Sequence, residues 1–233
     1  MGATGGVDEE QILFADGYSQ DREEIKMWYS IEGTIGVGKS TFIDKVVPFL
    51  QQEATTTVIP EPVEEWERTG ILKESYTDPT YRFPAQCTFF TSRIATFRSL
   101  YDPNGLNVSE RSPFSDKLFW NIQDVDPRLR KAYLDMWVLW QDLLPKRNPD
   151  LFIYLTTSLE TCMARIRERN RSAESSIDEE YMRKLTMEHD RYLMDPLGVL
   201  MPDGTRVPCV IISTDSNYRD DVNVARDIAK RIH

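Results

Sequence analysis

Two glycines, a lysine and a serine stand at the spacing G-x-x-x-x-G-K-[ST] in the segment GTIGVGKST, and a third glycine lies between the first two. Glycine lets the backbone turn its N–H groups inward around phosphate oxygens, and the positive end of a following helix adds to the attraction. Lys39 could contact the β- and γ-phosphates, and the Ser40 hydroxyl could bind Mg²⁺. The motif therefore predicts a loop that binds a nucleoside triphosphate; the alternative is a glycine-rich turn beside an exposed lysine. The predicted phosphate-binding residues of the loop are Gly33, Thr34, Ile35, Gly36, Val37, Gly38, Lys39, Ser40 and Thr41.

The loop motif alone would also fit a GTPase or a motor ATPase. Two further segments carry side chains suited to phosphoryl transfer. Glu61 lies between two prolines that hold the backbone extended, so its carboxylate could accept the proton of an attacking hydroxyl. Glu110 could hold Mg²⁺ directly or through water, and Arg111 could stabilise charge on the transferred phosphoryl group. The alternative is a surface acid and an ordinary ion pair on a loop.

A concentration of arginines follows in TCMARIRERNRSAESSI, a helical pattern that breaks into a serine-rich loop. A lid of this composition could close over a triphosphate and exclude water from it. The alternative is a solvated helix face whose charges are neutralised by neighbouring glutamates. The arginines concerned are Arg165, Arg167, Arg169 and Arg171.

These chemical segments need strands and helices that hold them together. Short β-branched or aliphatic runs alternate with segments long enough for crossover helices, which predicts an α/β fold with a five-stranded parallel sheet and helices on both of its faces. Ligands bind at the carboxyl ends of the strands in such sheets, and the glycine loop, Glu61, Glu110 with Arg111, and Asp215 each follow or end a run. The expected strand segments are 27–33, 55–62, 106–111, 150–157 and 208–214.

Composition limits the class of protein. The net charge of −10 would repel nucleic acid and anionic lipid, and no apolar run is long enough to cross a bilayer. The three cysteines are scattered without a CxxC pair, which favours reduced thiols in an intracellular, cytoplasmic protein. Residues 1–26 are polar and acidic and are expected to form a loosely ordered tail before one folded domain, residues 27–233.

Taken together, five motifs resemble the deoxynucleoside kinase family in its own order: IEGTIGVGKST, PEPVEEW, QCTFFTSR, SERSPFSD and RERNRSAES, with a DSNY turn near the end. The resemblance covers nearly everything after the tail. It implies the P-loop NTPase fold with an arginine-rich lid, and the transfer of the γ-phosphate of ATP, with Mg²⁺, to the 5′-hydroxyl of a deoxynucleoside. It also implies a homodimer that acts on small molecules.

The resemblance assigns roles to residues by position. Glu61 is expected to be the base and Arg111 to bridge the 5′-oxygen and the phosphates, with Lys39 as the third catalytic group. The expected base-binding residues are Gln86, which would read the edge of the base, and Trp66 and Phe114 as apolar walls that could also be core. Tyr76 and Glu174 would hold the 3′-hydroxyl. The lid arginines would be Arg165, Arg169 and Arg171, and the adenine of ATP would lie against Asp215, Asn217 and Tyr218.

Arg93 and Asp116 resemble the deoxycytidine and deoxyguanosine kinase branch of the family. A buried Arg–Asp pair leaves hydrogen-bonding groups for an exocyclic amine or a ring nitrogen and crowds the place of a thymine methyl group. Purine deoxynucleosides or deoxycytidine are therefore expected over thymidine. The sequence departs from the family's usual residues at Phe89, Phe90, Pro113 and Lys117, which could reshape the pocket.

Two rival functions remain open at this point: a nucleoside monophosphate kinase of the thymidylate type, and a catalytically silent nucleotide-binding subunit. Glu61 opposes the first, because a carboxylate would repel an anionic acceptor, and the complete set of candidate catalytic residues opposes the second. His189 has no neighbouring metal-binding partner in the sequence and is expected to pack or to face solvent. Tyr133, Trp137 and Trp140 recur at helical spacing and are expected in the core or at a subunit interface.

Overall fold

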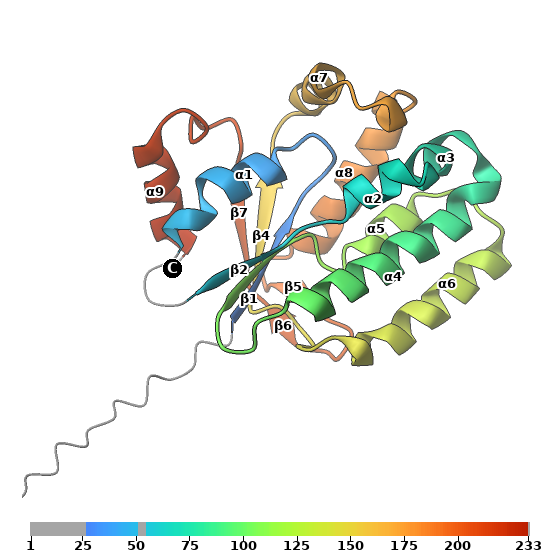
Figure 1. Ribbon diagram of the computed structural model, residues 1–233, viewed down its shortest axis with the longest axis horizontal. Coiled ribbons are helices and arrows are strands. Elements are labelled where there is room, and N and C mark those ends of the chain that lie inside the picture. The colour runs from blue at the N-terminus through green and yellow to red at the C-terminus, as the bar shows by residue number, and fades with distance from the viewer. Residues whose placement is uncertain (1–26, 51–54, 233) are drawn as a thin grey trace, which may run out of the picture.

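In the computed structural model, which describes residues 27–50 and 55–232, five parallel strands form the main sheet. They are β1 (Met27–Glu32), β2 (Thr56–Ile59), β3 (Leu106–Glu110), β4 (Leu151–Thr156) and β7 (Cys209–Ser213). Their order in the sheet is β2-β3-β1-β4-β7, and every neighbouring pair is parallel (Figure 1). Each strand lies within its predicted segment, so the predicted sheet is confirmed. The acidic segment 1–26 lies outside the described residues.

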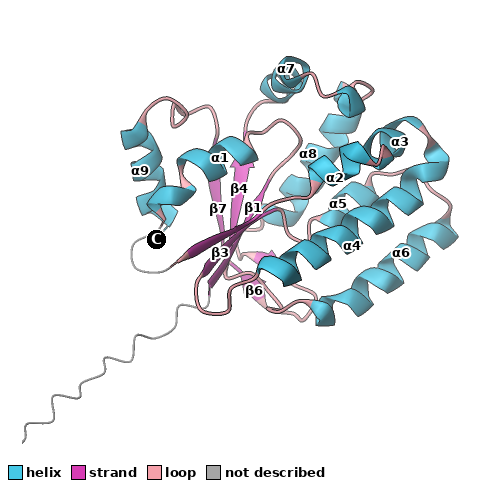
Figure 2. Ribbon diagram, viewed as in Figure 1, coloured by secondary structure: helices cyan, strands magenta, loops and turns pink. Residues whose placement is uncertain are grey.

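Helices cover both faces of this sheet, as predicted. Their bounds are α1 (Lys39–Lys45), α2 (Val63–Arg68), α3 (Ile71–Thr77), α4 (Arg82–Leu100), α5 (Asp116–Asn121), α6 (Pro127–Trp140), α7 (Leu159–Arg169), α8 (Glu179–Leu193) and α9 (Val222–Ile232). Short 3₁₀ turns are η1 (Val47–Phe49), η2 (Pro79–Tyr81), η3 (Gln141–Leu143) and η4 (Ser172–Glu174). In Figure 2, α1 and α9 lie on one side of the sheet, and α4, α5 and α6 lie together on the other.

The strands are apolar on both faces because each face meets a helical layer. In β1, Tyr29 and Ile31 join a core cluster with side chains of α1 and α9, whereas Trp28 joins a second cluster with side chains of α4, α5 and α6. In β4, Ile153 and Phe152 divide between the two clusters in the same way. Burying one such side chain contributes about 1.5–3 kcal/mol, so the two clusters hold the helices on the sheet.

A small antiparallel hairpin, β5 (Val199–Leu200) and β6 (Arg206–Val207), was not predicted from the sequence. Each strand has two residues, which is too short for an alternating pattern to be visible. Val199 and Val207 are buried in the second core cluster, so the hairpin extends that cluster.

Among the described residues, none of the helices combines the length and the apolar character that crossing a bilayer requires. All three cysteines lie in the described part of the chain, and each carries a free thiol.

The topology brings chemical segments that are far apart in sequence to one edge of the sheet. β1 lies between β3 and β4, and its carboxyl end leads into the glycine loop. Ile31 pairs with Glu110 across the β1–β3 register, and the backbone N–H of Arg111 donates to the Ile31 carbonyl at 2.9 Å. Glu61 follows β2, the neighbour of β3. Because the strands are parallel, all of these carboxyl ends meet at the same edge.

Candidate active site

The glycine loop between β1 and α1 adopts backbone conformations that other residues rarely take. Gly33, Gly36 and Gly38 have φ angles of 145°, 76° and 105°. A Cβ atom on Gly36 would lie 2.6 Å from the carbonyl oxygen of Cys162 in α7, and one on Gly33 would lie 2.7 Å from the carbonyl oxygen of Leu155 in β4. The loop therefore needs glycine for its turn and for its close packing against the elements beside it.

Lys39 and Ser40 open α1 at the end of this loop. The Lys39 ammonium donates to the carbonyl oxygen of Thr34 at 3.4 Å, so its side chain folds back over the loop. Burial and, to a smaller extent, the charge of Arg111 lower the pKa of Lys39 to about 8, although Glu110 partly opposes the shift. A bound phosphate would favour the charged lysine, as a phosphate-binding site requires.

The predicted Mg²⁺ site consists of two oxygen-bearing side chains. The Ser40 hydroxyl donates to Glu110 Oε1 at 3.3 Å across the space between α1 and the end of β3. The described residues hold no cluster of three or more carboxylate, imidazole or thiol groups that could enclose a metal ion. Mg²⁺ is usually held by one or two protein oxygens together with phosphate oxygens and water, and this pair fits such an ion.

A cavity of about 470 Å³ opens beside the loop. Its volume lies within the range of roughly 300–1,000 Å³ that is usual for small-molecule sites. Predicted donor-side and acceptor-side residues line the same space. They are Ile35, Gly36, Lys39, Ser40, Glu61, Trp66, Tyr76, Gln86, Arg93, Glu110, Arg111, Asp116, Arg169, Arg171 and Glu174.

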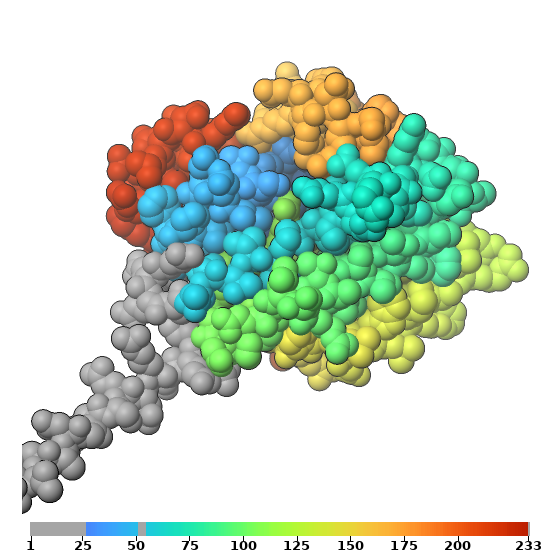
Figure 3. Space-filling view, viewed as in Figure 1, coloured from blue at the N-terminus to red at the C-terminus, as the bar shows by residue number. Residues whose placement is uncertain are grey.

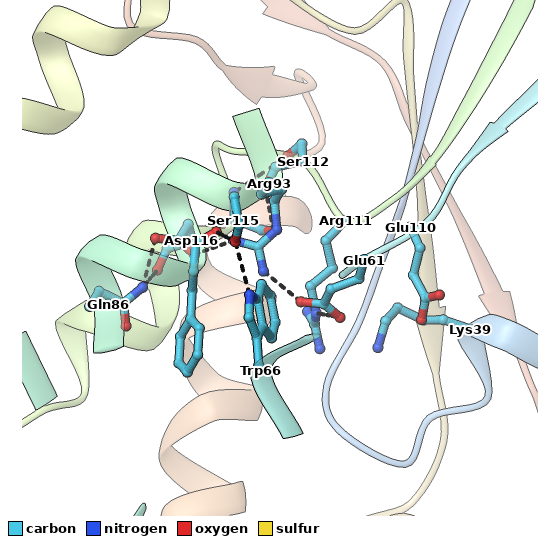
Figure 4. Close-up of polar contacts among 12 residues, drawn as sticks. Lys39, Glu61, Trp66, Gln86, Arg93, Glu110, Arg111, Ser112, Ser115 and Asp116 are labelled. Carbon is cyan, nitrogen blue, oxygen red and sulfur yellow. Dashed lines mark hydrogen bonds and ion pairs between the residues drawn. The ribbon is translucent and has the colours of Figure 1, made fainter. Parts of the chain in front are cut away.

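Glu61 lies between the loop and the far end of the cavity, with two arginines around its carboxylate (Figure 4). Its Oε1 accepts from Arg93 Nη2 at 2.5 Å, and its Oε2 lies 3.3 Å from Arg111 Nε. Burial alone would raise the pKa of Glu61, but the positive charges of Arg111, Arg93 and Lys39 outweigh it and hold the pKa below its usual value. The carboxylate is therefore ionised at neutral pH, and its remaining lone pairs can accept a proton.

Arg111 stands in a left-handed backbone conformation, with φ 63°, directly after β3. Glu32 at the buried end of β1 holds the next residue: its Oε1 accepts from the backbone N–H of Ser112 at 2.9 Å and from the Ser112 hydroxyl at 2.6 Å. A non-glycine residue in this region costs free energy and persists only where its surroundings hold it. The strained turn directs the guanidinium towards Glu61.

At the end of the cavity away from the loop, Asp116 collects three donors. Arg93 Nη1 donates to Oδ1, the Tyr133 hydroxyl donates to Oδ2, and Gln86 Nε2 donates to Oδ2 at 2.6 Å. An ionised carboxylate only accepts, so the Gln86 amide turns its NH₂ group to Asp116 and its oxygen elsewhere. Three of the roughly four acceptor positions of a carboxylate are thereby used.

Aromatic side chains form walls of the cavity. The Trp66 and Phe89 rings lie 4.4 Å apart between centroids, and the guanidinium of Arg93 lies 5.3 Å from the Trp66 centroid. Tyr76 meets Tyr181 edge-on at 5.8 Å, and burial raises its pKa well above the ordinary value. The Tyr76 hydroxyl therefore stays neutral and can both donate and accept.

The segment after α7 closes one side of the cavity through an ionic cluster. Arg169 Nη2 donates to Glu174 at 2.6 Å, Arg171 Nη1 donates to the same carboxylate at 3.1 Å, and Arg171 Nε lies 3.1 Å from Glu67 of α2. The turn η4 packs against α3, and Figure 3 shows this orange segment lying against the teal one. Two predicted lid arginines and the predicted sugar-binding glutamate are thus brought together.

Phe114 does not line the cavity and takes the second of its two expected places, the core. Its side chain is almost completely buried in the aromatic core, with ring centroids 6.3 Å from Trp28 and 6.1 Å from Trp137. The turn after Arg111 directs Phe114 towards α6, and Phe89 of α4 supplies the wall beside Trp66 instead.

Arg165 lies beside the glycine loop, and its predicted contact with the phosphates of ATP stays a prediction. Its Nη1 donates to the Val37 carbonyl at 2.9 Å and to the Thr214 hydroxyl at 3.0 Å. The guanidinium therefore ties the glycine loop to the end of β7 and does not line the cavity.

The predicted adenine-binding residues lie on the segment after β7, outside the cavity lining. Asp215 accepts from the Thr157 hydroxyl at 2.5 Å, and Tyr218 is buried with its ring edge-on to Phe42 at 5.8 Å. Asn217 lies on the same segment, and its backbone carbonyl accepts from Asp221 at the start of α9. Adenine binding here stays a prediction.

Several residues that line the cavity were not assigned from the sequence. Phe89 carried one signal, its unusual bulk in the QCTFFTSR segment, but the others lie in helices or turns whose patterns indicate only an amphipathic face. They include Leu72, Ser75, Arg82, Phe119, Gln123 and Tyr181.

The sheet order, the glycine loop and the cavity beside it define a P-loop phosphotransferase. The sequence profile of the deoxynucleoside kinase family matches residues 29–233, and the chain belongs to that family. It is 28% identical over 214 residues to a probable deoxycytidine kinase of Fowlpox virus, covering 88% of this chain and 86% of that protein. It is also 28% identical over 185 residues to a thymidine kinase of Ictalurid herpesvirus 1 (76% and 79%), and 31% identical over 170 residues to a deoxyguanosine kinase of Lactobacillus johnsonii (66% and 71%).

Proposed function

We propose that this deoxynucleoside kinase transfers the γ-phosphate of ATP to the 5′-hydroxyl of deoxycytidine or a purine deoxynucleoside in preference to thymidine. The observation that carries the proposal is the position of Glu61. Its ionised carboxylate lies between a phosphate-binding loop at one end of the cavity and a set of hydrogen-bonding groups suited to a nucleobase at the other. A nucleoside that spans this space would place its sugar hydroxyl near Glu61.

The residues of the chain divide the work of the reaction. Glu61 accepts the proton of the 5′-hydroxyl as the hydroxyl oxygen attacks the γ-phosphorus of ATP, and the bond from that phosphorus to the bridging oxygen breaks to release ADP. Arg111 and Lys39 hold the phosphate oxygens and stabilise the charge that develops on the transferred group. Ser40 and Glu110 would hold Mg²⁺, which supplies charge neutralisation to the β- and γ-phosphates when it is bound. Arg169 and Arg171 would exclude water above the site.

The preference for an amino-bearing base is supported by the hydrogen bonds of Asp116. With three donors bound, this carboxylate keeps room for about one more donor and offers none itself. An exocyclic amine could fill that position, whereas the O4 carbonyl of thymine would face a carboxylate oxygen without a proton between them. The relatives include both a probable deoxycytidine kinase and a thymidine kinase, so their names favour neither base. The proposed base preference is therefore inferred from Asp116 and its hydrogen-bond partners alone.

The base preference can be tested with the four deoxynucleosides in turn, at saturating ATP and Mg²⁺. We expect kcat/KM for thymidine to be at least about tenfold below that for the best of the other three, because one unmatched polar group at a buried site costs about 1–3 kcal/mol. Tyr133→Phe removes one donor from Asp116, and Tyr133 does not line the cavity. This variant should change the ratios of kcat/KM among the four deoxynucleosides while leaving KM for ATP unaffected. A clear preference for thymidine would refute the Asp116 argument.

A homodimer is also part of the proposal. Large apolar side chains are exposed on and just after α6, among them Leu129, Val138, Leu139 and Leu143, and a partner subunit would cover such a face.

The intracellular location of the protein stays a prediction from its composition.

A further inference from the structure

His189 lies inside α8, completely buried, directly behind Arg111. One ring nitrogen, Nδ1, lies 2.8 Å from the carbonyl oxygen of Leu185, one turn earlier in the helix. The other, Nε2, lies 3.4 Å from Arg111 Nη1. The imidazole thus bridges the helix backbone and the guanidinium that reaches the cavity.

The two contacts determine the form of the ring. A backbone carbonyl only accepts, so Nδ1 carries the proton and donates to Leu185. Nε2 then has a lone pair, which can accept from Arg111, a side chain with donors only. Burial, helped by the charge of Arg111, lowers the pKa of His189 to about 3, so the ring is neutral at physiological pH.

Three different groups surround the guanidinium of Arg111. Glu61 Oε2 lies 3.3 Å from its Nε, the Phe119 ring lies against its face with the centroid 4.6 Å from Cζ, and His189 meets Nη1. The Glu61 carboxylate and the His189 imidazole approach different nitrogens of the guanidinium, so together they limit its rotation in its own plane. The Phe119 ring limits its tilt out of that plane. Further N–H groups of the fork are left for a phosphate oxygen.

From this arrangement we infer that His189 is a positioning residue, whose Nε2 accepts from Arg111 Nη1 and holds the guanidinium in the orientation that phosphoryl transfer needs. The inference rests on the proposed function, because it acts through Arg111. A neutral acceptor suits this place, because a second carboxylate besides Glu61 would further offset the charge that Arg111 must offer to the phosphate, and a second cation would repel Arg111. A purely packing role would be filled equally well by a hydrocarbon ring of the same shape.

The test compares His189→Phe, which keeps a ring but removes the acceptor, with His189→Gln, whose amide oxygen can reach the place of Nε2. The control is Tyr154→Phe, which removes a 2.6 Å hydrogen bond from Tyr154 to Asp190 on the same helix and leaves Arg111 untouched. For each variant, kcat, KM for the deoxynucleoside and the thermal midpoint are measured. Misplacing a catalytic group by about 1 Å costs on the order of 100-fold.

We expect His189→Phe to lower kcat about 10- to 100-fold with KM changed less than about threefold, and His189→Gln to recover most of kcat. Tyr154→Phe should lower the thermal midpoint with kcat nearly unchanged. A His189→Phe variant with the wild-type kcat would overturn the inference, and so would a folded His189→Gln variant as impaired as His189→Phe.

If His189→Phe does not fold, His189→Asn takes its place, since the shorter amide reaches towards Leu185 and not towards Arg111. Activity retained in the Gln variant and lost in the Asn variant supports the inference, and equal activity of the two overturns it. A wild-type chain that phosphorylates no deoxynucleoside would overturn the proposed function as well. An active wild-type chain with an unaffected His189→Phe variant would overturn only the role of His189.

Discussion

Replacing Glu61 by glutamine should lower kcat by about 10²- to 10⁴-fold, the usual contribution of a general base. The amide keeps the shape of the side chain and can still accept from Arg93 or Arg111, but it cannot take the proton of the 5′-hydroxyl. Both arginines lose a buried anionic partner, so the thermal midpoint should fall as well. Initial rates are therefore compared well below the midpoint of the variant, with saturating ATP and deoxynucleoside.

Glu64→Gln is the matched control for this change. Glu64 also lines the cavity, as the second residue of α2, but it is exposed, and the ion pairs of Arg93 and Arg111 are with Glu61 and Asp116 instead. Its substitution should leave kcat within about twofold of the wild type, as expected for a surface change. If Glu61→Gln kept the wild-type kcat, the assignment of Glu61 as the general base would be wrong. A complete loss of activity in Glu64→Gln would indicate that Glu64 is the base instead.

Arg111→Lys should lower kcat by about 10³-fold, near the lower end of what an arginine at a transferred phosphoryl group contributes. Lysine keeps the charge and bears the same strain at φ 63°, so the backbone effect is matched. It cannot contact Glu61, His189 and a phosphate oxygen at once, because it lacks the planar fork. The measurement is kcat at saturating substrates, with KM for ATP determined separately.

Arg165→Lys is the control, because Arg165 ties the glycine loop to the end of β7 and does not face the cavity. We expect this control to raise KM for ATP or to lower stability while kcat changes little. A loss of kcat in Arg165→Lys as large as that in Arg111→Lys would mean that the two arginines act alike, contrary to the geometry of this structure.

The sheet could be predicted because its strands are buried on both faces and therefore appear as apolar runs in the sequence, as β1 and β4 do. The hairpin β5–β6 could not, since two residues a strand leave no pattern. The glycine loop was predictable in detail because its spacing is set by backbone geometry. The buried strands and the glycine loop were predictable because each depends on a short stretch of sequence.

Side-chain direction after a turn was not predictable. Phe114 was expected either as a wall of the base site or as core, and it lies in the core, because the strained turn at Arg111 directs it towards Trp137. Tyr133 was expected in the core or at an interface; it is buried, but its hydroxyl reaches Asp116. His189 was expected to pack or to face solvent and is buried against Arg111. For Tyr133 and His189, helical spacing indicates a face and leaves open which distant residue that face meets.

The central claim is that the acceptor is a sugar hydroxyl beside Glu61. The direct measurement incubates the protein with γ-labelled ATP, Mg²⁺, and either a deoxynucleoside or its 5′-monophosphate, and identifies the labelled product. We predict labelled 5′-monophosphate from the deoxynucleoside and no product from the monophosphate, which the ionised Glu61 would repel. Label transferred to the monophosphate alone would contradict the account.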